Sequence, residues 1–165
     1  LQNYYTAINA YDIALEYDPS ISYALLNRGT LRYEMDEFIY SDNRYTNSIT
    51  ITRNSSSNTK KSNVEPPDHQ AVLSDFDKVI SINPDLPFVY YNRANVKLST
   101  KNYQRAIDDY SMAIKLQPNL AEAYYNRALT LLYLNENKLA CKDLSVAGEL
   151  GITEAYNVIK RYCNK

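Results

Sequence analysis

The sequence predicts an all-α protein made of stacked antiparallel helix hairpins, and three regularities support this fold class. The residues Tyr-Tyr-Asn-Arg-Ala at positions 90–94 return at positions 124–128. Between the two copies, apolar residues at 103–116 follow the i, i+3, i+4, i+7 spacing of a helix with one buried face. Pro118 follows that helix, and Pro84 precedes Pro118 by the same interval that separates the two copies. A repeat of this length is typical of stacked helical hairpins.

The pattern continues toward the N-terminus with one interruption. Residues 25–29 are a third copy of the phrase, and they precede the second copy by the same long interval that separates Pro19 from Pro84. This interval is nearly twice the repeat period, so one repeat carries an insertion of about one repeat length. In chain order we expect the second helix of a truncated repeat at 1–19, a repeat at 22–84 with a low-complexity insertion at about 40–68, repeats at 87–120 and 121–152, and a C-terminal capping helix at 153–165.

Each complete repeat is expected to form two helices joined by a short turn. In the repeat at 87–120, an apolar stripe covers 88–98, a polar turn follows at 99–102, and the second helix covers 103–116. Pro118 ends that helix, because proline cannot continue a helix and restricts the residue before it. Short turns make the two helices antiparallel.

The insertion differs in composition from the repeats. Residues 54–63 are polar and almost without apolar side chains, so we expect this stretch to be mobile and outside the packed fold. Just before it, residues 48–52 alternate with the period of a strand. Two interpretations remain open: an insertion tolerated between two helices, or a short strand that docks on a partner or on the repeats. Asp68 is expected to cap the delayed second helix.

The spacing of aromatic residues, alanine and proline resembles the tetratricopeptide repeat. That resemblance implies a right-handed α-solenoid, and it covers all but the insertion and the last dozen residues. Two features depart from the family pattern: the aromatic residue late in the first helix is replaced by Arg32, Lys97 and Leu131, and Ile152 stands at one proline position. The matching positions are Leu25, Gly29, Val72, Phe76, Val79 and Pro84 in one repeat, Tyr90, Ala94, Ala106, Tyr110, Ala113 and Pro118 in the next, and Tyr124, Ala128, Ala140, Leu144 and Ala147 in the last.

Arginine and aspartate recur in phase with the repeat. The arginine falls on the first helix and the aspartate on the second helix of the same repeat, so we expect structural ion pairs that hold each hairpin together. Ligand binding by the arginines is the alternative. The expected pairs are Arg28 with Asp75, Arg93 with Asp109, and Arg127 with Asp143.

In the resembled family, a row of asparagines lines the concave groove formed by the first helices. A primary amide both donates and accepts hydrogen bonds, so one amide per repeat suits the backbone of an extended peptide. The alternative is that these asparagines only bond locally. The expected peptide-binding residues are Asn27, Asn92 and Asn126, with Leu26, Tyr91 and Tyr125 beside them and Phe88, Asn95 and Leu129 on the same face.

One ligand known in that family is not expected here. Co-chaperone members hold the C-terminal carboxylate of heat-shock proteins with two lysines, an arginine and two asparagines. Of the five matching positions only Asn92 agrees, and Glu122 at a lysine position repels a carboxylate. The other three are Leu26, Asn126 and Thr30.

Catalysis and small cofactors find little support in the sequence. His69 is the only histidine and is expected to be an exposed residue at a helix start, and three glycines leave no phosphate-binding loop of the usual kind. Asp108 and Asp109 do not form a metal-binding cluster. We therefore expect no enzyme activity, no cofactor and no metal.

Charge and cysteine usage bear on partners and compartment. The net charge of −1 gives no attraction to nucleic acid or to anionic lipid, and no apolar run is long enough to span a membrane. Cys141 and Cys163 show no disulfide-like spacing, so we expect reduced thiols in the cytoplasm or another reducing intracellular compartment.

The expected function is a non-catalytic scaffold that binds a peptide or helical segment of another protein in the concave groove. Two alternatives remain open: a purely architectural segment of a larger assembly, and an accessory module of an enzyme whose catalytic domain lies outside these residues. Because the repeat pattern starts in mid-repeat, we expect the chain to be part of a longer protein.

Overall fold

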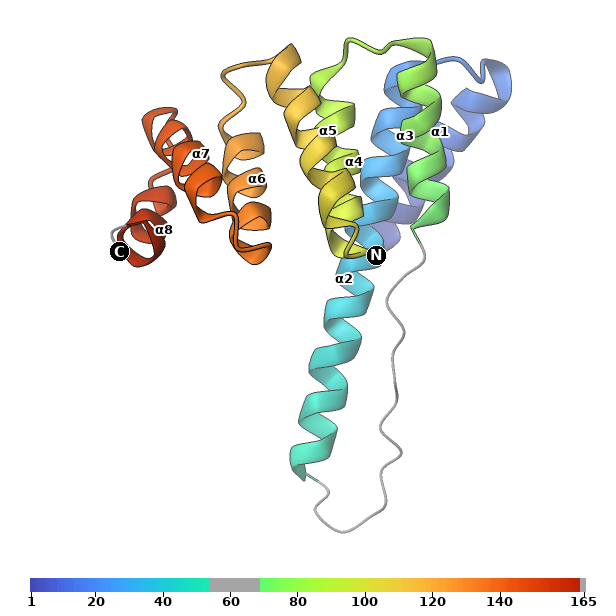
Figure 1. Cartoon of the computed structure of the whole chain (residues 1–165). Helices are drawn as coiled ribbons and strands as arrows, with labels where there is room; N and C mark the ends of the chain where they lie inside the picture. Colours follow the sequence, from blue (N-terminus) through green and yellow to red (C-terminus); the bar gives the residue numbers. More distant parts are fainter. Residues whose placement is uncertain (54–68, 164–165) are drawn as a thin grey trace. The chain divides into compact units, whose positions relative to one another are not determined.

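The computed structural model describes residues 1–53 and 69–163, and these form eight α-helices and no strand (Figure 1). The all-α prediction is confirmed. By contacts within the chain, residues Leu1–Asp75 and Phe76–Lys165 form two compact units, and each is described separately below. The helices are α1 (Gln2–Tyr17), α2 (Ser22–Arg53), α3 (Gln70–Ile82), α4 (Pro87–Ser99), α5 (Tyr103–Leu116), α6 (Ala121–Tyr133), α7 (Asn137–Glu149) and α8 (Glu154–Tyr162).

In the first unit, α1 and α2 pack against each other as a hairpin. Leu15 of α1 and Leu25 of α2 are buried, which removes apolar surface from water and stabilises the hairpin. The turn between the helices is fixed by Asp18, whose Oδ1 accepts hydrogen bonds from the backbone N–H and the hydroxyl of Ser20. These bonds lower the pKa of Asp18 below its ordinary value.

Helix α2 continues well beyond the expected start of the insertion. It spans 32 residues and ends at Arg53, so the alternative interpretation of 48–52 as a strand is wrong. Alternating β-branched residues favour a strand only weakly, and the structural context can override that preference. The low-complexity stretch at 54–63 and the expected cap at Asp68 lie outside the described residues.

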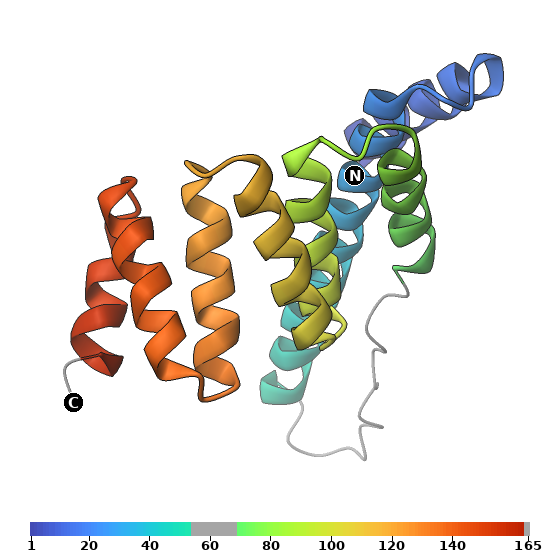
Figure 2. The ribbon, with the colours of Figure 1, turned by 45° about the horizontal axis from the view of Figure 1, so that its top comes forward.

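In the second unit, α4 packs with α5 and α6 packs with α7, and further contacts join α5 to α6 and α7 to α8 (Figures 1 and 2). The side chains at the close approaches are alanines with no exposed surface, which lets the helix backbones come together. Tyr110 and Leu144 are fully buried beside them. The buried alanines are Ala94, Ala106, Ala113, Ala128, Ala140 and Ala147.

The two hairpin turns repeat in detail. Lys101 and Asn135, one period apart, both have a positive φ, 62° and 63°. In each turn the backbone N–H of the next residue donates a hydrogen bond to a carbonyl of the first helix. Asn102 donates to the Lys97 carbonyl at 2.8 Å, and Glu136 donates to the Leu131 carbonyl at 2.9 Å. This pattern satisfies carbonyls that the end of a helix leaves unpaired.

The end of α7 differs from the end of α5 because no proline follows it. Gly151 has a φ of 110°, a conformation that glycine adopts without strain. The N–H of Ile152 then bonds the carbonyl of Ala147 at 2.9 Å. This turn brings α8 onto α7, where Ala155 is buried.

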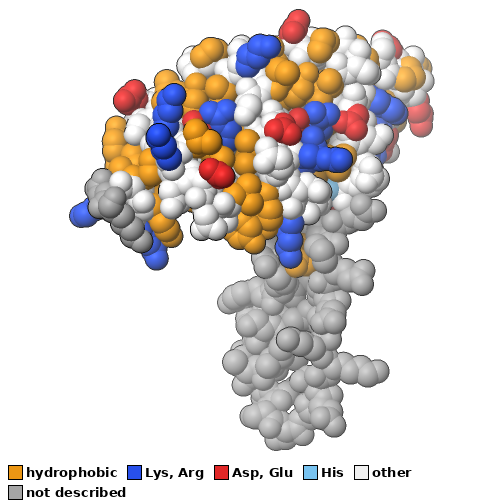
Figure 3. Space-filling view, viewed as in Figure 1, with side chains coloured by type: hydrophobic (Ala, Val, Ile, Leu, Met, Phe, Trp, Pro, Cys, Tyr) orange, Lys and Arg blue, Asp and Glu red, His pale blue; other side chains and the backbone are white. Residues whose placement is uncertain are grey.

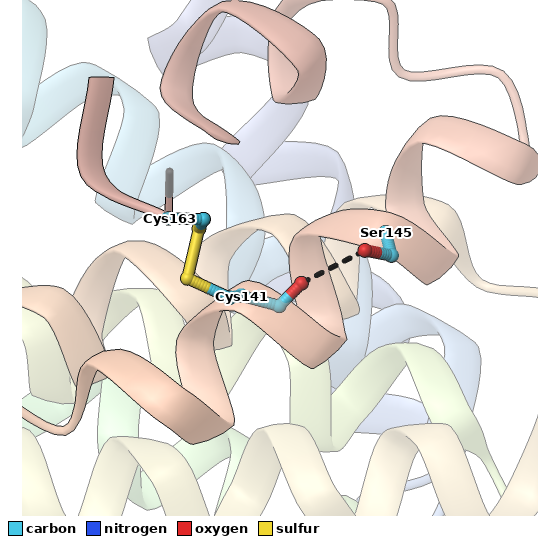
Figure 4. The surroundings of a disulfide bond; sticks show 3 residues. All are labelled: Cys141, Ser145 and Cys163. Atoms are coloured by element: carbon cyan, nitrogen blue, oxygen red, sulfur yellow. Dashed lines mark hydrogen bonds between the residues drawn. A yellow bond between two sulfur atoms is a disulfide. The ribbon is translucent and has the colours of Figure 1, made fainter. Parts of the chain in front are cut away.

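The expectation of two separate thiols is wrong, because Cys141 of α7 and Cys163 after α8 form a disulfide (Figure 4). Their Cα atoms are 5.8 Å apart, within the range that a disulfide requires. The inference from unpaired thiols to a reducing compartment therefore loses its basis. No described helix is long and apolar enough to cross a membrane.

Candidate functional site

Arginine–aspartate pairs hold the hairpins of the second unit together. In the hairpin of α4 and α5, Arg93 donates from Nε to Asp109 Oδ2 at 2.8 Å and from Nη2 to Oδ1 at 2.7 Å. In the hairpin of α6 and α7, Arg127 makes the same pair of bonds to Asp143 at 2.7 and 2.8 Å. Such two-bond pairs fix geometry as well as charge.

The first unit contains the corresponding pair between α2 and α3. Arg28 donates from Nε to Asp75 Oδ2 at 2.9 Å, and it also donates from Nη1 to Asp12 Oδ1 of α1 at 2.7 Å. Arg32 bonds the same two carboxylates. Four charges therefore balance within one cluster.

Sequence reasoning missed the second carboxylate that Arg28 and Arg93 each bond. Arg93 also donates from Nη1 to Asp77 Oδ1 of α3 at 2.6 Å, and Lys97 bonds Asp109 Oδ2 at 2.6 Å. Asp77 follows Asp12 by the same interval that separates Arg93 from Arg28, so the repeat period was the signal that could have revealed it. These arginines therefore join the two helices of one repeat to the second helix of the repeat before it.

The clusters shift the pKa values of two arginines. Burial alone lowers the pKa of the Arg93 guanidinium, but the bonds and charges of Asp109 and Asp77 outweigh burial and raise it. The pKa of Arg28 is raised chiefly by its hydrogen bond to Asp75. Both arginines therefore stay charged.

The first helices of the second unit face each other through a polar network. Asn126 of α6 donates from Nδ2 to the Tyr91 hydroxyl and to Asn95 Oδ1 of α4, both at 3.2 Å. The buried hydroxyl of Tyr110 donates to the same Asn95 Oδ1 at 2.6 Å. The Asn126 amide nitrogen is thus bonded locally, while among the described residues its Oδ1 accepts no hydrogen bond.

Apolar side chains flank this network. Phe88 and Leu129 are 49% and 38% exposed, while Tyr91, Asn92 and Tyr125 are half-buried. Positions 88, 91, 92 and 95 follow the helical spacing of one face, as do 125, 126 and 129. We call this surface the first-helix face: Phe88, Tyr91, Asn92, Asn95, Tyr125, Asn126 and Leu129.

The two expected binding residues of the first unit behave differently. Leu26 is buried, with 8% of its surface exposed, so its side chain belongs to the core. Asn27 is exposed and donates from Nδ2 to the Tyr11 hydroxyl at 3.2 Å. Leu26 was expected in the groove because it directly precedes Asn27 in the sequence, and its burial depends on helix packing that the sequence does not show.

His69 is buried, so the expectation of an exposed residue is wrong. Its ring packs edge-on against Tyr33, with ring centres 5.1 Å apart. Nδ1 lies 3.4 Å from Asp36 Oδ2 and Nε2 lies 3.4 Å from Glu37 Oε1. The approach to Asp36 is close in distance but does not have hydrogen-bond geometry. His69, which directly precedes α3, therefore packs against α2.

Comparisons with known proteins agree with this architecture. The tetratricopeptide repeat family model matches residues 87–120. A comparison with curated protein sequences gives no significant match.

Among described residues, no group of three or more His, Cys, Asp or Glu side chains could hold a metal ion.

Solved structures share the fold at low sequence identity. The crystal structure of the MamA protein aligns with a TM-score of 0.67 and 21% identity, covering 94% of this chain and 69% of MamA. The first repeat domain of Spaghetti (RPAP3), solved with the HSP90 peptide SRMEEVD, aligns with a TM-score of 0.54 and 24% identity, covering 56% and 75% of the two chains. The tetratricopeptide repeat domain of Arabidopsis OM64 aligns with a TM-score of 0.53 and 24% identity, covering 56% of this chain and 78% of the OM64 chain.

The sequence period, the helix hairpins with buried alanines and the family match at 87–120 all lead to one assignment. The chain has the fold of a tetratricopeptide-repeat solenoid, and its residues 87–120 match the tetratricopeptide repeat family model.

Proposed function

We propose that this protein is a non-catalytic scaffold whose first-helix face binds an extended segment of another protein. The proposal rests on the half-buried amide of Asn126, which is held by Tyr91 and Asn95 and has an open Oδ1. A fixed acceptor loses little conformational freedom on binding, which favours affinity.

The side chains around that amide suit a peptide. Phe88 and Leu129 offer exposed apolar area, and Tyr91 and Tyr125 offer rings with polar tips, a residue type enriched at protein interfaces. Asn92 and Asn126 lie one repeat apart on helices separated by roughly 10 Å, which is about three residues of extended chain. Successive amides could therefore meet the backbone of one peptide.

The ligand that we propose is neutral or mixed in charge. The first-helix face as defined carries no charged residue, so we expect binding that depends weakly on salt. The RPAP3 domain was solved with an HSP90 peptide, but the positions that hold a terminal carboxylate in co-chaperones include Leu26, Glu122 and Thr30 here. Leu26 is in the core, and Thr30 donates its hydroxyl to the Leu26 carbonyl at 2.8 Å. We do not propose a heat-shock carboxylate as ligand.

The test uses peptides selected from a displayed library of random sequences on the full chain. The double change Asn92→Ala with Asn126→Ala should weaken the selected peptides at least tenfold, about 1.4 kcal/mol. Tyr110→Phe is the control, because it disturbs the Asn95 contact from the buried side without facing the peptide. It should leave binding within about threefold, a cost below about 1 kcal/mol.

Two results would contradict the proposal. If the asparagine double variant binds the selected peptides as tightly as the parent, the first-helix face is not the site. If Tyr110→Phe costs as much as the double change, disturbance of the network rather than loss of the amides explains the effect. The architectural role within a larger assembly would then take its place.

A further inference from the structure

A second surface of the same unit has a cleft that the peptide-binding proposal does not use. It lies between the second helices α5 and α7, with α6 between them, and has a volume of about 460 Å³. This volume is in the range of roughly 300–1,000 Å³ that is common for ligand pockets. Figure 3 shows apolar and basic side chains gathered over α5 and α7. The apolar walls are Ile107, Ile114, Tyr124, Leu131, Leu139 and Val146.

Two charged positions of the repeat are neutral at this cleft. In the repeat before it, Asp77 bonds an arginine and Lys97 bonds the paired aspartate. One period later these positions hold Ser111 and Leu131. The Ser111 hydroxyl accepts the Nη1 bond of Arg127 at 2.8 Å, in place of a carboxylate. Shorter and uncharged side chains therefore line this cleft at the positions where the repeat before it has an ion-pair cluster.

The rim of the cleft is basic. Arg127 and Asp143 neutralise each other, so their pair adds no net charge. Lys142, which lines the cleft, stands one period after Asp108, so the rim charge is reversed between the two repeats. Lys142 is exposed and makes no ion pair or hydrogen bond within the part of the chain that the structure describes. An apolar cleft thus carries one unneutralised ammonium at its edge.

We infer that this cleft binds a short acidic segment of another protein, one that places a large apolar side chain beside a carboxylate. The apolar side chain would bury against Ile107, Leu131 and Val146, where removal from water supplies the driving force. The carboxylate would meet the Lys142 ammonium, and complementary charge selects acidic partners over basic ones. The residues lie on different helix faces from Asn92 and Asn126, so the inference does not rest on the first-helix proposal.

The test uses two labelled peptides and the full chain, with binding followed by fluorescence anisotropy. One peptide has a central Phe-Leu pair flanked by aspartates, and its twin has lysines in place of the aspartates. We expect saturable binding of the acidic peptide, at least tenfold weaker binding of the lysine twin, and weakening of the acidic complex as salt rises.

Two matched variants locate the site. Ser111→Asp with Leu131→Lys installs the side chains that Asp77 and Lys97 supply one period earlier, so it should fill the cleft with ion pairs, keep helicity and abolish binding. Lys142→Glu should weaken the acidic peptide at least tenfold. Lys160→Glu on α8 makes the same charge change away from the cleft and should leave binding unchanged.

Each remaining outcome overturns the inference. Absence of saturable binding at millimolar peptide, equal binding of the lysine twin, or insensitivity to both cleft variants would each do so. Self-association that the Ser111→Asp, Leu131→Lys variant removes would identify a second copy as the occupant instead. Loss of the acidic peptide through Asn92→Ala and Asn126→Ala alone would place it on the first-helix face, which removes this inference and leaves the proposed function standing.

Discussion

Arg93 holds Asp109 through two hydrogen bonds, with Nε 2.8 Å from Oδ2 and Nη2 2.7 Å from Oδ1. The side chain of Asp109 is 7% exposed and that of Arg93 is 17% exposed. Removing one partner of such a pair strands the other charge away from water, which costs more than the pair itself contributes.

This geometry predicts strong coupling between the two residues. Arg93→Ala should lower the melting temperature, and the double change with Asp109→Ala should cost less than the sum of the two single changes by about 1–3 kcal/mol. Thermal and urea unfolding of the four proteins measure the coupling. Strict additivity would contradict the pairing, and Arg105→Ala on the exposed side of α5 serves as the neutral control.

The repeat period explains how much of the fold the sequence could predict. Each alanine that recurs in phase is fully buried at a helix contact, and the arginine and aspartate of each pair lie in contact. These features depend on spacing within one repeat, which a period reveals directly. The loss of charge at Ser111 and Leu131 is equally visible in the sequence, but the cleft that these residues line depends on how three helices pack.

Other features depend on contacts that no local pattern encodes. The disulfide joins cysteines 22 residues apart, and only the turn at Gly151 brings α8 back onto α7. His69 is buried because α2 continues past Tyr33 and covers it with Asp36 and Glu37. In the sequence, Asp36 and Glu37 are separated from His69 by the insertion, so no local pattern places them beside its ring.

The outer part of α2 should be dispensable for the packed repeats. His69 already contacts Asp36 and Glu37, so both ends of the insertion meet at the packed fold. Deleting residues 41–64 and rejoining the chain with a short turn should reduce the helical circular dichroism, because α2 loses its outer turns, and leave the melting midpoint within a few degrees, since loop length costs little. A marked fall in the midpoint would show that residues 41–64 stabilise the repeats.

The disulfide should stabilise the C-terminal helix in particular. For a separation of 22 residues, loop closure in the unfolded chain gives about 3 kcal/mol. Reduction, or Cys163→Ser, should therefore raise amide hydrogen exchange in α8 while α4 and α5 stay protected. Intact mass before and after reduction reports whether the bond is present. Equal exchange of α8 in the oxidised and reduced protein would contradict this role, and Ser145→Ala, on the same face of α7, is the matched control (Figure 4).

His69 should contribute to stability mainly through the volume of its ring. The side chain is 2% exposed and packs against Tyr33, so His69→Ala should open a cavity and cost about 2–4 kcal/mol of unfolding free energy. His69→Leu fills most of that space and also removes Nδ1, a buried polar atom without a hydrogen-bond partner. Such a change is expected to be nearly neutral, within about 1 kcal/mol.

Hydrogen exchange across α2 and α3 measures both substitutions, because unfolding in repeat proteins need not be all-or-none. We expect faster exchange in both helices for His69→Ala and near-parent protection for His69→Leu. If leucine costs as much as alanine, the approaches of the ring nitrogens to Asp36 and Glu37 at 3.4 Å, rather than packing, account for the contribution of His69. If neither change alters exchange, His69 does not hold the start of α3 against α2.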